Sequence, residues 1–513
     1  MDISRSTLHA TGAAFAAVAL LLSGCTSGAA SPRTPPPTKA AARAALAAYY
    51  EQKLSWHECG GGAGFECATL TAPLDYARPA DGHDLKLAVS RKKAGGPGER
   101  LGSLMVNPGG PGGSAIEYLQ SYAGIGYPAR VRARYDMVAM DPRGVAASEP
   151  ITCLGDKQMD AFTQTDQTPD APAETRRLVA SYQKFARGCA TRSGEILGHV
   201  STVEAARDMD LLRAVLGDRK LTYVGASYGT FLGATYADLF PRRVGRLVLD
   251  GALDPALSSE RINRDQTAGF ETAFTAFAQD CVRRTGCPLG TRDVAQARER
   301  LTAFFTRLDA HPVPTGENRR LGESLATTGV LAALYDEGAW PQLRTALRSA
   351  MRGDGSGLLT LADLYYERDG DGSYANLMYA NPAVNCLDLP PAFRTPADVR
   401  KAIPVFQKAS PVFGKALAWS ALNCAYWPVH PTGTPRPLHA KGAAPIVVVG
   451  TTRDPATPYT WARSLSSQLT SATLLTYDGD GHTAYGRGSA CIDTAIDTYL
   501  LTGAPPPANK RCS

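Results

Sequence analysis

Leu221-Thr222-Tyr223-Val224-Gly225-Ala226-Ser227-Tyr228-Gly229 joins a short apolar run to a G-x-S-x-G motif, and a helical pattern continues from it to Phe240. No other G-x-S-x-G occurs in the chain. Between a strand and a helix, the flanking glycines allow a tight turn that exposes the Ser227 hydroxyl above a sheet. We therefore interpret Ser227 as a nucleophile, with a chance glycine-rich turn as the alternative.

Short apolar runs alternate with helical stretches around this motif, a pattern typical of a parallel sheet covered on both faces. An antiparallel edge pair is predicted at 66–74 and 85–92. One helix has clear boundaries, because Ser201 and Glu204 form a capping box and Gly217 ends it. The other predicted strands are Ser103–Asn107, Tyr135–Met140, Leu221–Gly225, Arg246–Asp250, Pro445–Gly450 and Thr473–Tyr477.

A long segment separates the strand ending at Asp250 from the strand starting at Pro445. Its 194 residues, 251–444, far exceed an ordinary crossover and predict a separate domain. We expect a mainly helical insertion between two parts of a core, 46–250 and 445–513. Its helical patterns cover Phe270–Arg284, Val294–Leu308, Trp340–Met351 and Pro396–Lys408.

A serine hydroxyl needs a base, and the base needs an orienting carboxylate. In an α/β sheet with this serine motif, the chain order is serine, acid, histidine. His482 follows the last predicted strand and Asp454 follows the strand before it, so we assign these two as base and acid. Asp478 and Asp480 are rival acids, but they lie in the histidine's own loop and would reach back awkwardly.

A glycine-rich loop, Asn107-Pro108-Gly109-Gly110-Pro111-Gly112-Gly113-Ser114, follows the strand at Ser103. This is the place from which such a sheet supplies a second oxyanion donor, and glycines let a backbone N–H come close. We expect the oxyanion hole to use the N–H groups of Tyr228 and of Gly109 or Gly110. A plain glycine turn is the alternative.

The N-terminus predicts export. Arg5 precedes the apolar run Ala13–Leu22, which is too short to span a bilayer and is typical of a signal peptide over residues 1–24. Leu22-Ser23-Gly24-Cys25 resembles the bacterial lipobox, so Cys25 is expected to carry a lipid; an ordinary cleavage site is the alternative. Residues 25–45 are expected to be a Ser/Pro-rich tether. The expected location is the outer face of the bacterial cell membrane.

Ten cysteines remain beside Cys25, an even number that favours disulfides in an exported chain. We expect nearest-neighbour pairing, and the absence of C-x-x-C and H-E-x-x-H motifs gives zinc no support. The expected bridges are Cys59–Cys67, Cys153–Cys189, Cys281–Cys287, Cys386–Cys424 and Cys491–Cys512.

Composition narrows the class of protein. Of 513 residues, 44% are hydrophobic and 20% are charged, which excludes a wholly disordered, collagenous or coiled-coil chain. The formal net charge of +6 is modest for a nucleic-acid domain. We therefore expect a globular monomer without a nucleic-acid partner, attached to a membrane only through its lipid.

Taken together, the motifs resemble those of the α/β-hydrolase aminopeptidases, specifically the secreted bacterial tripeptidyl aminopeptidases related to prolyl iminopeptidase. The resemblance runs from about Cys59 to Cys512 and rests on NPGGPGGS, DPRG at 141–144, GASYGT followed by YADLFP, LDG at Leu249, GTTRDPATP and GHTAYG. One departure is Ala146, which stands where the family loop often carries a second glycine, so the shape of that loop is open.

The resemblance implies an α/β-hydrolase fold with a mostly parallel, doubly wound sheet and a large helical cap. It also implies serine-dependent release of short peptides, tripeptides in particular, from free N-termini, without a cofactor. A carboxylesterase and a non-catalytic surface-binding lipoprotein are the alternatives.

An exopeptidase of this kind should pair the substrate's buried ammonium with a carboxylate of the cap. The candidates are Asp336 and Glu337 beside Trp340, Glu367, and Asp388. We favour Asp388, because its neighbour Cys386 is expected to lie in a disulfide that holds the loop.

Overall fold

The structure, a computed structural model, describes residues 39–513. The expected signal peptide, Cys25 and most of the tether lie outside the described residues. Residues 39–45, expected in the tether, instead begin helix α1, Lys39–Glu51. The expected tether therefore extends too far, because the alanine-rich sequence that follows Pro37 has high helix propensity.

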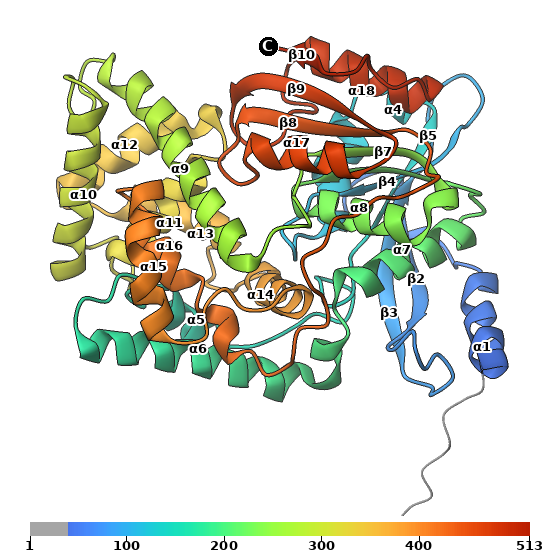
Figure 1. The fold of residues 1–513 in the computed structure, drawn as a ribbon, viewed down its shortest axis with the longest axis horizontal. Coiled ribbons are helices and arrows are strands. Elements are labelled where there is room, and N and C mark those ends of the chain that lie inside the picture. The colour runs from blue at the N-terminus through green and yellow to red at the C-terminus, as the bar shows by residue number, and fades with distance from the viewer. Residues whose placement is uncertain (1–38) are drawn as a thin grey trace, which may run out of the picture.

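One sheet of mostly parallel strands forms the core (Figure 1). Its order is β1-β2-β3-β5-β4-β6-β7-β8-β9-β10, and the expected antiparallel pair is confirmed as β2 and β3. The two terminal strands, β1 and β10, are too short for a sequence pattern. The strands are β1 His57–Glu58, β2 Phe65–Pro73, β3 Asp84–Lys92, β4 Gly102–Asn107, β5 Tyr135–Met140, β6 Leu221–Ala226, β7 Val244–Asp250, β8 Ile446–Arg453, β9 Ala472–Asp480 and β10 Lys510–Cys512.

Helices cover both faces of this sheet, as expected of a doubly wound fold. Alternate residues of β8 point to opposite faces: Val448 packs with the helices α7, α8 and α17, whereas Val447 and Val449 pack with α4 and α18. Helix α7 begins after its N-cap Ser201 and stops before Gly217, whose φ is +80°, as the sequence predicted. The core helices are α1, α2 Ala115–Tyr118, α3 Gly124–Gly126, α4 Ala129–Arg132, α7 Thr202–Val215, α8 Tyr228–Leu239, α17 Tyr459–Gln468 and α18 Ala490–Thr502.

A helical cap lies beside the carboxyl edge of the sheet (Figure 1). Most of it lies between β7 and β8, within residues 251–444. Two helices within the expected core segment 46–250, α5 and α6, also contact the cap. Leu178 and Tyr182 of α6 share a buried cluster with Phe406 and Trp419, and the Thr163 carbonyl of α5 accepts from the Ser324 hydroxyl. The cap helices are α5 Asp156–Thr163, α6 Pro172–Ser193, α9 Ser259–Val282, α10 Val294–Ala310, α11 Glu323–Ala333, α12 Trp340–Met351, α13 Ser356–Tyr366, α14 Leu377–Asp388, α15 Pro396–Ala409 and α16 Gly414–Ser420.

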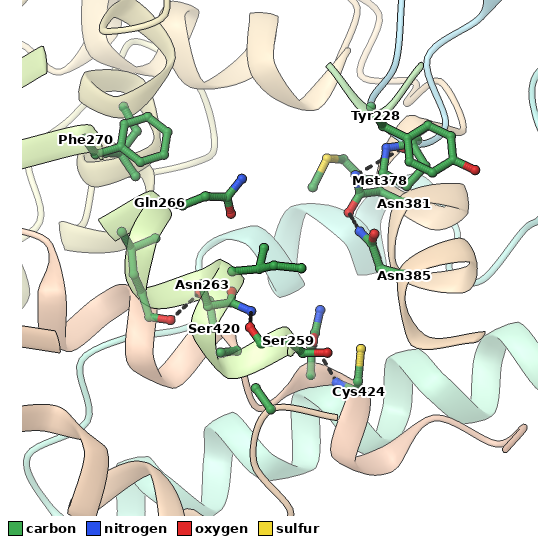
Figure 2. A pocket seen from close by; sticks show the side chains of 18 of the residues that line it. Tyr228, Ser259, Asn263, Gln266, Phe270, Met378, Asn381, Asn385, Ser420 and Cys424 are labelled. Carbon is green, nitrogen blue, oxygen red and sulfur yellow. Dashed lines mark hydrogen bonds between the residues drawn. The ribbon is translucent and has the colours of Figure 1, made fainter. Parts of the chain in front are cut away.

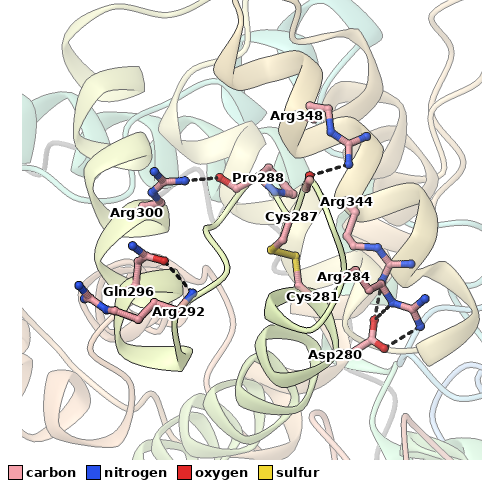
Figure 3. Close-up of a disulfide and its surroundings, with 11 residues drawn as sticks. Asp280, Cys281, Arg284, Cys287, Pro288, Arg292, Gln296, Arg300, Arg344 and Arg348 are labelled. Carbon is pink, nitrogen blue, oxygen red and sulfur yellow. Dashed lines mark hydrogen bonds and ion pairs between the residues drawn. A yellow bond between two sulfur atoms is a disulfide. The ribbon is translucent and has the colours of Figure 1, made fainter.

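Five disulfides join the ten cysteines in the expected sequential pairing. Figure 3 shows the Cys281–Cys287 bridge, which closes the turn after α9 at the outer end of the cap. Arg348 donates to the Gly286 carbonyl at 2.9 Å and so ties this turn to α12. Among residues 39–513, every helix is too short or too polar to cross a bilayer.

In the DPRG loop after β5, Ala146 stands in place of the second family glycine and has a left-handed backbone conformation. Ala146 has φ +43°, and its N–H donates to Asn376 Oδ1 at 2.7 Å. The substitution that left the loop shape open has therefore preserved a left-handed backbone, at a cost of about 1–2 kcal/mol for a residue with a Cβ.

We expect Ala146→Gly to raise the free energy of unfolding by up to about 1 kcal/mol, because relief of the left-handed conformation exceeds the added entropy of the unfolded chain. Urea unfolding measures this. Gly144→Ala is the matched control: φ is +82° there and a Cβ would lie 2.8 Å from Val200 Cγ1, so this variant should be destabilised. A destabilised Ala146→Gly protein would contradict the strain.

Candidate active site

The carboxyl ends of five neighbouring strands bring the expected site residues to one edge of the sheet. Asn107 at the end of β4 pairs with Gly225 of β6, and Ala226 pairs with Asp250 of β7. Asp454 follows β8, and His482 follows β9, its neighbour in the sheet. Ligands bind at the carboxyl ends of strands in open α/β sheets, so this edge is the expected place for chemistry.

Ser227 lies on the sharp turn that the G-x-S-x-G motif predicted. Its φ of +55° and ψ of −125° are uncommon for a residue with a side chain. Its N–H donates to the Asp250 carbonyl at 2.8 Å, which fixes the turn to β7. Both flanking glycines are needed, because a Cβ at Gly225 would lie 2.4 Å from the Gly229 carbonyl oxygen and one at Gly229 would lie 2.9 Å from that of Asn107.

His482 is held by the acid assigned from the sequence. Its Nδ1 lies 2.9 Å from both carboxylate oxygens of Asp454, whose side chain is fully buried. Asp454 also accepts hydrogen bonds from the N–H and the hydroxyl of Thr457, which fix the carboxylate. The rival acids Asp478 and Asp480 instead form ion pairs with Arg453.

The loop that carries His482 has two further supports, which the sequence left unassigned. Asp250 is buried and accepts from the N–H groups of Ala484 and Tyr485; its pKa is raised by burial. The N–H of His482 donates to the Tyr335 carbonyl of the cap at 2.8 Å, and the Tyr335 ring lies edge-on to the imidazole.

The Ser227 hydroxyl has no direct hydrogen bond to His482 among the bonds of residues 39–513. Catalytic hydrogen bonds often shorten only when substrate binds. Ser227 lines a cavity together with Thr457, whose hydroxyl lies 3.4 Å from His482 Nδ1.

The geometry distinguishes between the two glycines considered for the oxyanion hole. The N–H of Gly109 donates to Asn107 Oδ1 at 2.9 Å and is therefore occupied. Within residues 39–513, the N–H groups of Gly110 and Tyr228 have no hydrogen-bond acceptor. Gly109 packs against the nucleophile turn, where a Cβ would lie 2.9 Å from Tyr228 N. Gly110 and Tyr228 are thus the two donors available to an oxyanion.

A cavity of about 460 Å³ extends from Ser227 into the cap. One face of α11 lines it, because Glu323, Thr327 and Leu331 recur at a spacing of four residues, and Tyr335 follows beside His482. Helix α11 therefore runs along the cavity, with Glu323 as its first residue and with His482 beside Tyr335, which follows its last residue.

Amide side chains line much of this cavity. Figure 2 shows Asn263 and Gln266 of α9 opposite Asn381 and Asn385 of α14, with Gln266 pointing into the intervening space. Amides both donate and accept hydrogen bonds, which suits the peptide main chain of a substrate.

The carboxylates expected to bind a substrate amine lie elsewhere or are occupied. Glu337 is exposed in the short helix η4, Glu337–Ala339, and Asp336 pairs with Arg487. Glu367 lies at the end of α13 outside the cavity lining, and burial, with Glu117 and Asp369 nearby, raises its pKa to about 7.

Asp388, the favoured candidate, is buried and lines the cavity, but it faces the core. Its two oxygens accept from the N–H of Thr202 at 2.8 Å and from the Thr202 hydroxyl at 2.5 Å. Burial raises the pKa of Asp388 to about 7. Its carboxylate is therefore occupied by Thr202 rather than free for an ammonium group.

The cavity lining contains two carboxylates that the sequence did not single out, Asp254 and Glu323. Asp254 Oδ1 accepts from Gln468 Nε2 at 2.7 Å and from the Ala256 N–H at 2.9 Å.

Glu323 is the first residue of α11. It accepts a hydrogen bond from the Thr168 hydroxyl at 2.5 Å, and its pKa is raised by burial and by Asp309 and Asp166. The signal was weak, because Glu323 stands at the start of a helix, where an acidic residue is ordinary helix capping chemistry.

Two groups of side chains in the described part of the chain come within metal-ligand reach of one another. Glu204 of the Asp75, His199 and Glu204 group already bonds Ser201 and lies 3.7 Å from Arg143, whose positive charge would oppose a cation. The second group is Glu323 with Asp166 and Asp309, far from His482 along α11. The residues at the carboxyl edge of the sheet form no such group.

Known proteins with similar sequences match nearly the whole chain. It is 38% identical over 529 residues to serine protease Hip1 of Mycobacterium tuberculosis, covering 98% of this chain and 96% of that protein. It is 32% identical over 483 residues to the tripeptidyl aminopeptidase of Streptomyces coelicolor, covering 90% and 86%. Carboxylesterase B of Mycobacterium tuberculosis is 38% identical over 456 residues, covering 87% and 86%.

A family model described as TAP-like protein matches residues 410–512. Among solved structures, the proline iminopeptidase of Mycobacterium smegmatis is 15% identical with a TM-score of 0.32, covering 84% of this chain and 97% of that one. Because the sequence alignments run through core and cap alike, the chain belongs to the TAP-like family of α/β-hydrolase serine peptidases.

Proposed function

We propose that this protein is a lipid-anchored extracellular exopeptidase that releases short peptides, tripeptides in particular, from free N-termini. The observation that carries this proposal is the position of Glu323, a carboxylate in the wall of the cavity that contains Ser227. An ammonium group taken out of water needs such a partner.

The chemistry would proceed through an acyl-enzyme. Ser227 attacks the scissile carbonyl while His482 takes its proton, and Asp454 fixes the imidazole tautomer. The N–H groups of Gly110 and Tyr228 stabilise the oxyanion. His482 then protonates the leaving amine, and water releases the acyl group by the same steps in reverse order.

The length of α11 supports a short released peptide. Its eleven residues span about 15 Å at the usual rise per residue. Three extended residues span roughly 10 Å, which leaves a few ångströms for the side chains at each end. A tripeptide with its ammonium at Glu323 would therefore bring its third carbonyl towards Ser227.

A carboxylesterase remains the second candidate, because the same machinery cleaves esters and one relative of equal identity is named carboxylesterase B. The amides and carboxylates that line the cavity favour a peptide over a purely apolar ester.

Export and lipid attachment are supported by the lipobox-like Leu22-Ser23-Gly24-Cys25 and by the five disulfides, which persist in oxidising compartments. The proposed partners are peptides with a free N-terminus and, through the lipid alone, the outer face of the bacterial membrane.

Ser227→Ala should reduce kcat by about 10⁶-fold and abolish labelling by a fluorophosphonate, because the attacking oxygen is gone.

Asp454→Asn should reduce kcat by about 10⁴-fold, because the geometry of the site survives while the imidazole has the wrong tautomer. Asp480→Asn, which removes a surface partner of Arg453, is the control. A larger loss in Asp480→Asn than in Asp454→Asn would show that the acid is misassigned.

Glu323→Gln should raise KM for free-amine tripeptide substrates by roughly 10- to 100-fold, because a hydrogen bond to a charged group is worth about 1.5–3 kcal/mol. Hydrolysis of N-acetylated peptides and small esters should be unchanged. Glu337→Gln, an exposed residue outside the cavity lining, is the matched control. Equal cleavage of free and acetylated peptides by the wild-type enzyme would favour the esterase or an endopeptidase instead.

Cys25→Ser should release the protein from the membrane fraction of a bacterial host into the soluble fraction, because thioether attachment of the lipid is lost. Cell fractionation with metabolic labelling by a fatty acid measures this. Retention of the variant on the membrane with unchanged labelling would refute lipid attachment at Cys25.

A further inference from the structure

Helix α14 of the cap contacts both halves of the oxyanion hole. Asn381, Asn385 and Asp388 lie on one face of it, at i, i+4 and i+7. Asn385 donates to Asn381 Oδ1, which orients the Asn381 amide. The Cys386–Cys424 disulfide joins the helix to the 3₁₀ turn η5, Asn423–Tyr426. This bridge restricts the movement of the C-terminal end of α14.

The first contact is with the glycine-rich loop. Asn381 Nδ2 donates at 3.1 Å to the carbonyl of Pro111, the residue that follows Gly110. The loop packs directly on the helix, because a Cβ at Gly112 would lie 2.9 Å from the Leu377 carbonyl oxygen and 3.1 Å from Asn381 N. The conformation that presents the Gly110 N–H is therefore bonded to the cap.

The second contact reaches Tyr228 through a buried chain of hydrogen bonds. The Thr202 hydroxyl donates to Asp388 at 2.5 Å, so the Tyr228 hydroxyl, 2.5 Å from the same Thr202 oxygen, is the donor to it. All three side chains are at least nine-tenths buried. This chain fixes the ring of the residue whose N–H faces the oxyanion.

We propose that α14 positions the oxyanion hole, with Asn381 holding the Gly110 loop and Asp388 holding Tyr228 through Thr202. Neither side chain is assigned contact with the reacting atoms, so both are positioning residues. The proposal rests on the acyl-transfer chemistry proposed above, and it links the placement of the cap to stabilisation of the transition state.

Asn381→Ala and Thr202→Val test the two contacts separately. Loss of an oxyanion donor costs about 10²- to 10³-fold in kcat, so loss of its positioning should cost less, about 10- to 100-fold. The loss should be equal for a tripeptide amide and a small ester, with KM within about threefold of wild type, because the oxyanion is common to both reactions. Thr202→Val is preferred to Asp388→Asn as the first variant, since it keeps the buried carboxylate and its backbone bond.

A peptide aldehyde provides a second readout, because it forms a tetrahedral adduct with the serine. Its inhibition constant should rise by the factor by which kcat falls, whereas that of the matching peptide alcohol, which forms no adduct, should stay constant. Asp388→Asn combined with Thr202→Val should cost little more than Thr202→Val alone, since both interrupt one chain. If these residues had only a structural role, their variants would change the free energy of unfolding without a selective rise in the inhibition constant of the aldehyde.

Asn376→Ala is the control. Asn376 precedes α14 and bonds the helix to the DPRG loop, through the Gly144 carbonyl and the Ala146 N–H, away from the oxyanion hole. We expect its kcat to stay within twofold of wild type. Wild-type kcat in Asn381→Ala and Thr202→Val, or an equal loss in Asn376→Ala, would overturn the proposal. An active Ser227→Ala protein would instead overturn the proposed function.

Discussion

The backbone turn at Ser227 is the constraint on which the site depends. A residue with a side chain at φ +55° costs about 1–2 kcal/mol, and it persists because its surroundings allow no alternative. Ser227 N bonds the Asp250 carbonyl. Positions 225 and 229 have no room for a Cβ, and both are glycine. The same Asp250 holds the histidine loop through its carboxylate, so one residue at the end of β7 positions the nucleophile and the base together.

The sheet and the places of Ser227, Asp454 and His482 at its carboxyl edge could be predicted from the sequence because their signals are local. Buried parallel strands form short apolar runs, and Asp454 and His482 follow such runs directly. The cap was harder to predict, because α11 contains few polar residues to mark a face and α14 contains Pro382. Nothing in the sequence of α6 indicates that Leu178 and Tyr182 pack with the cap helices.

The carboxylate proposed to bind a substrate amine shows more sharply what the sequence does not reveal. The sequence favours Asp388, because its neighbour Cys386 is expected in a disulfide, and the Cys386–Cys424 bridge is present. The sequence does not show the direction of a side chain. Asp388 and Glu323 both line the cavity, but both oxygens of Asp388 bond Thr202, whereas a single oxygen of Glu323 bonds Thr168. Which way a helix end faces is set by tertiary packing, and both residues are acidic groups at helix termini.

The contacts of the cap give it a part in the chemistry beyond covering the site. Tyr335 at the end of α11 holds the backbone of His482, and α14 holds both sides of the oxyanion hole. A peptide bound along α11, as proposed, would interact with the helix that leads to Tyr335 and so to His482. Binding energy from parts of the substrate far from the scissile bond can then be used at the reacting carbonyl. Since a small ester makes none of these remote contacts, a fixed triad can favour peptides through kcat as well as through affinity.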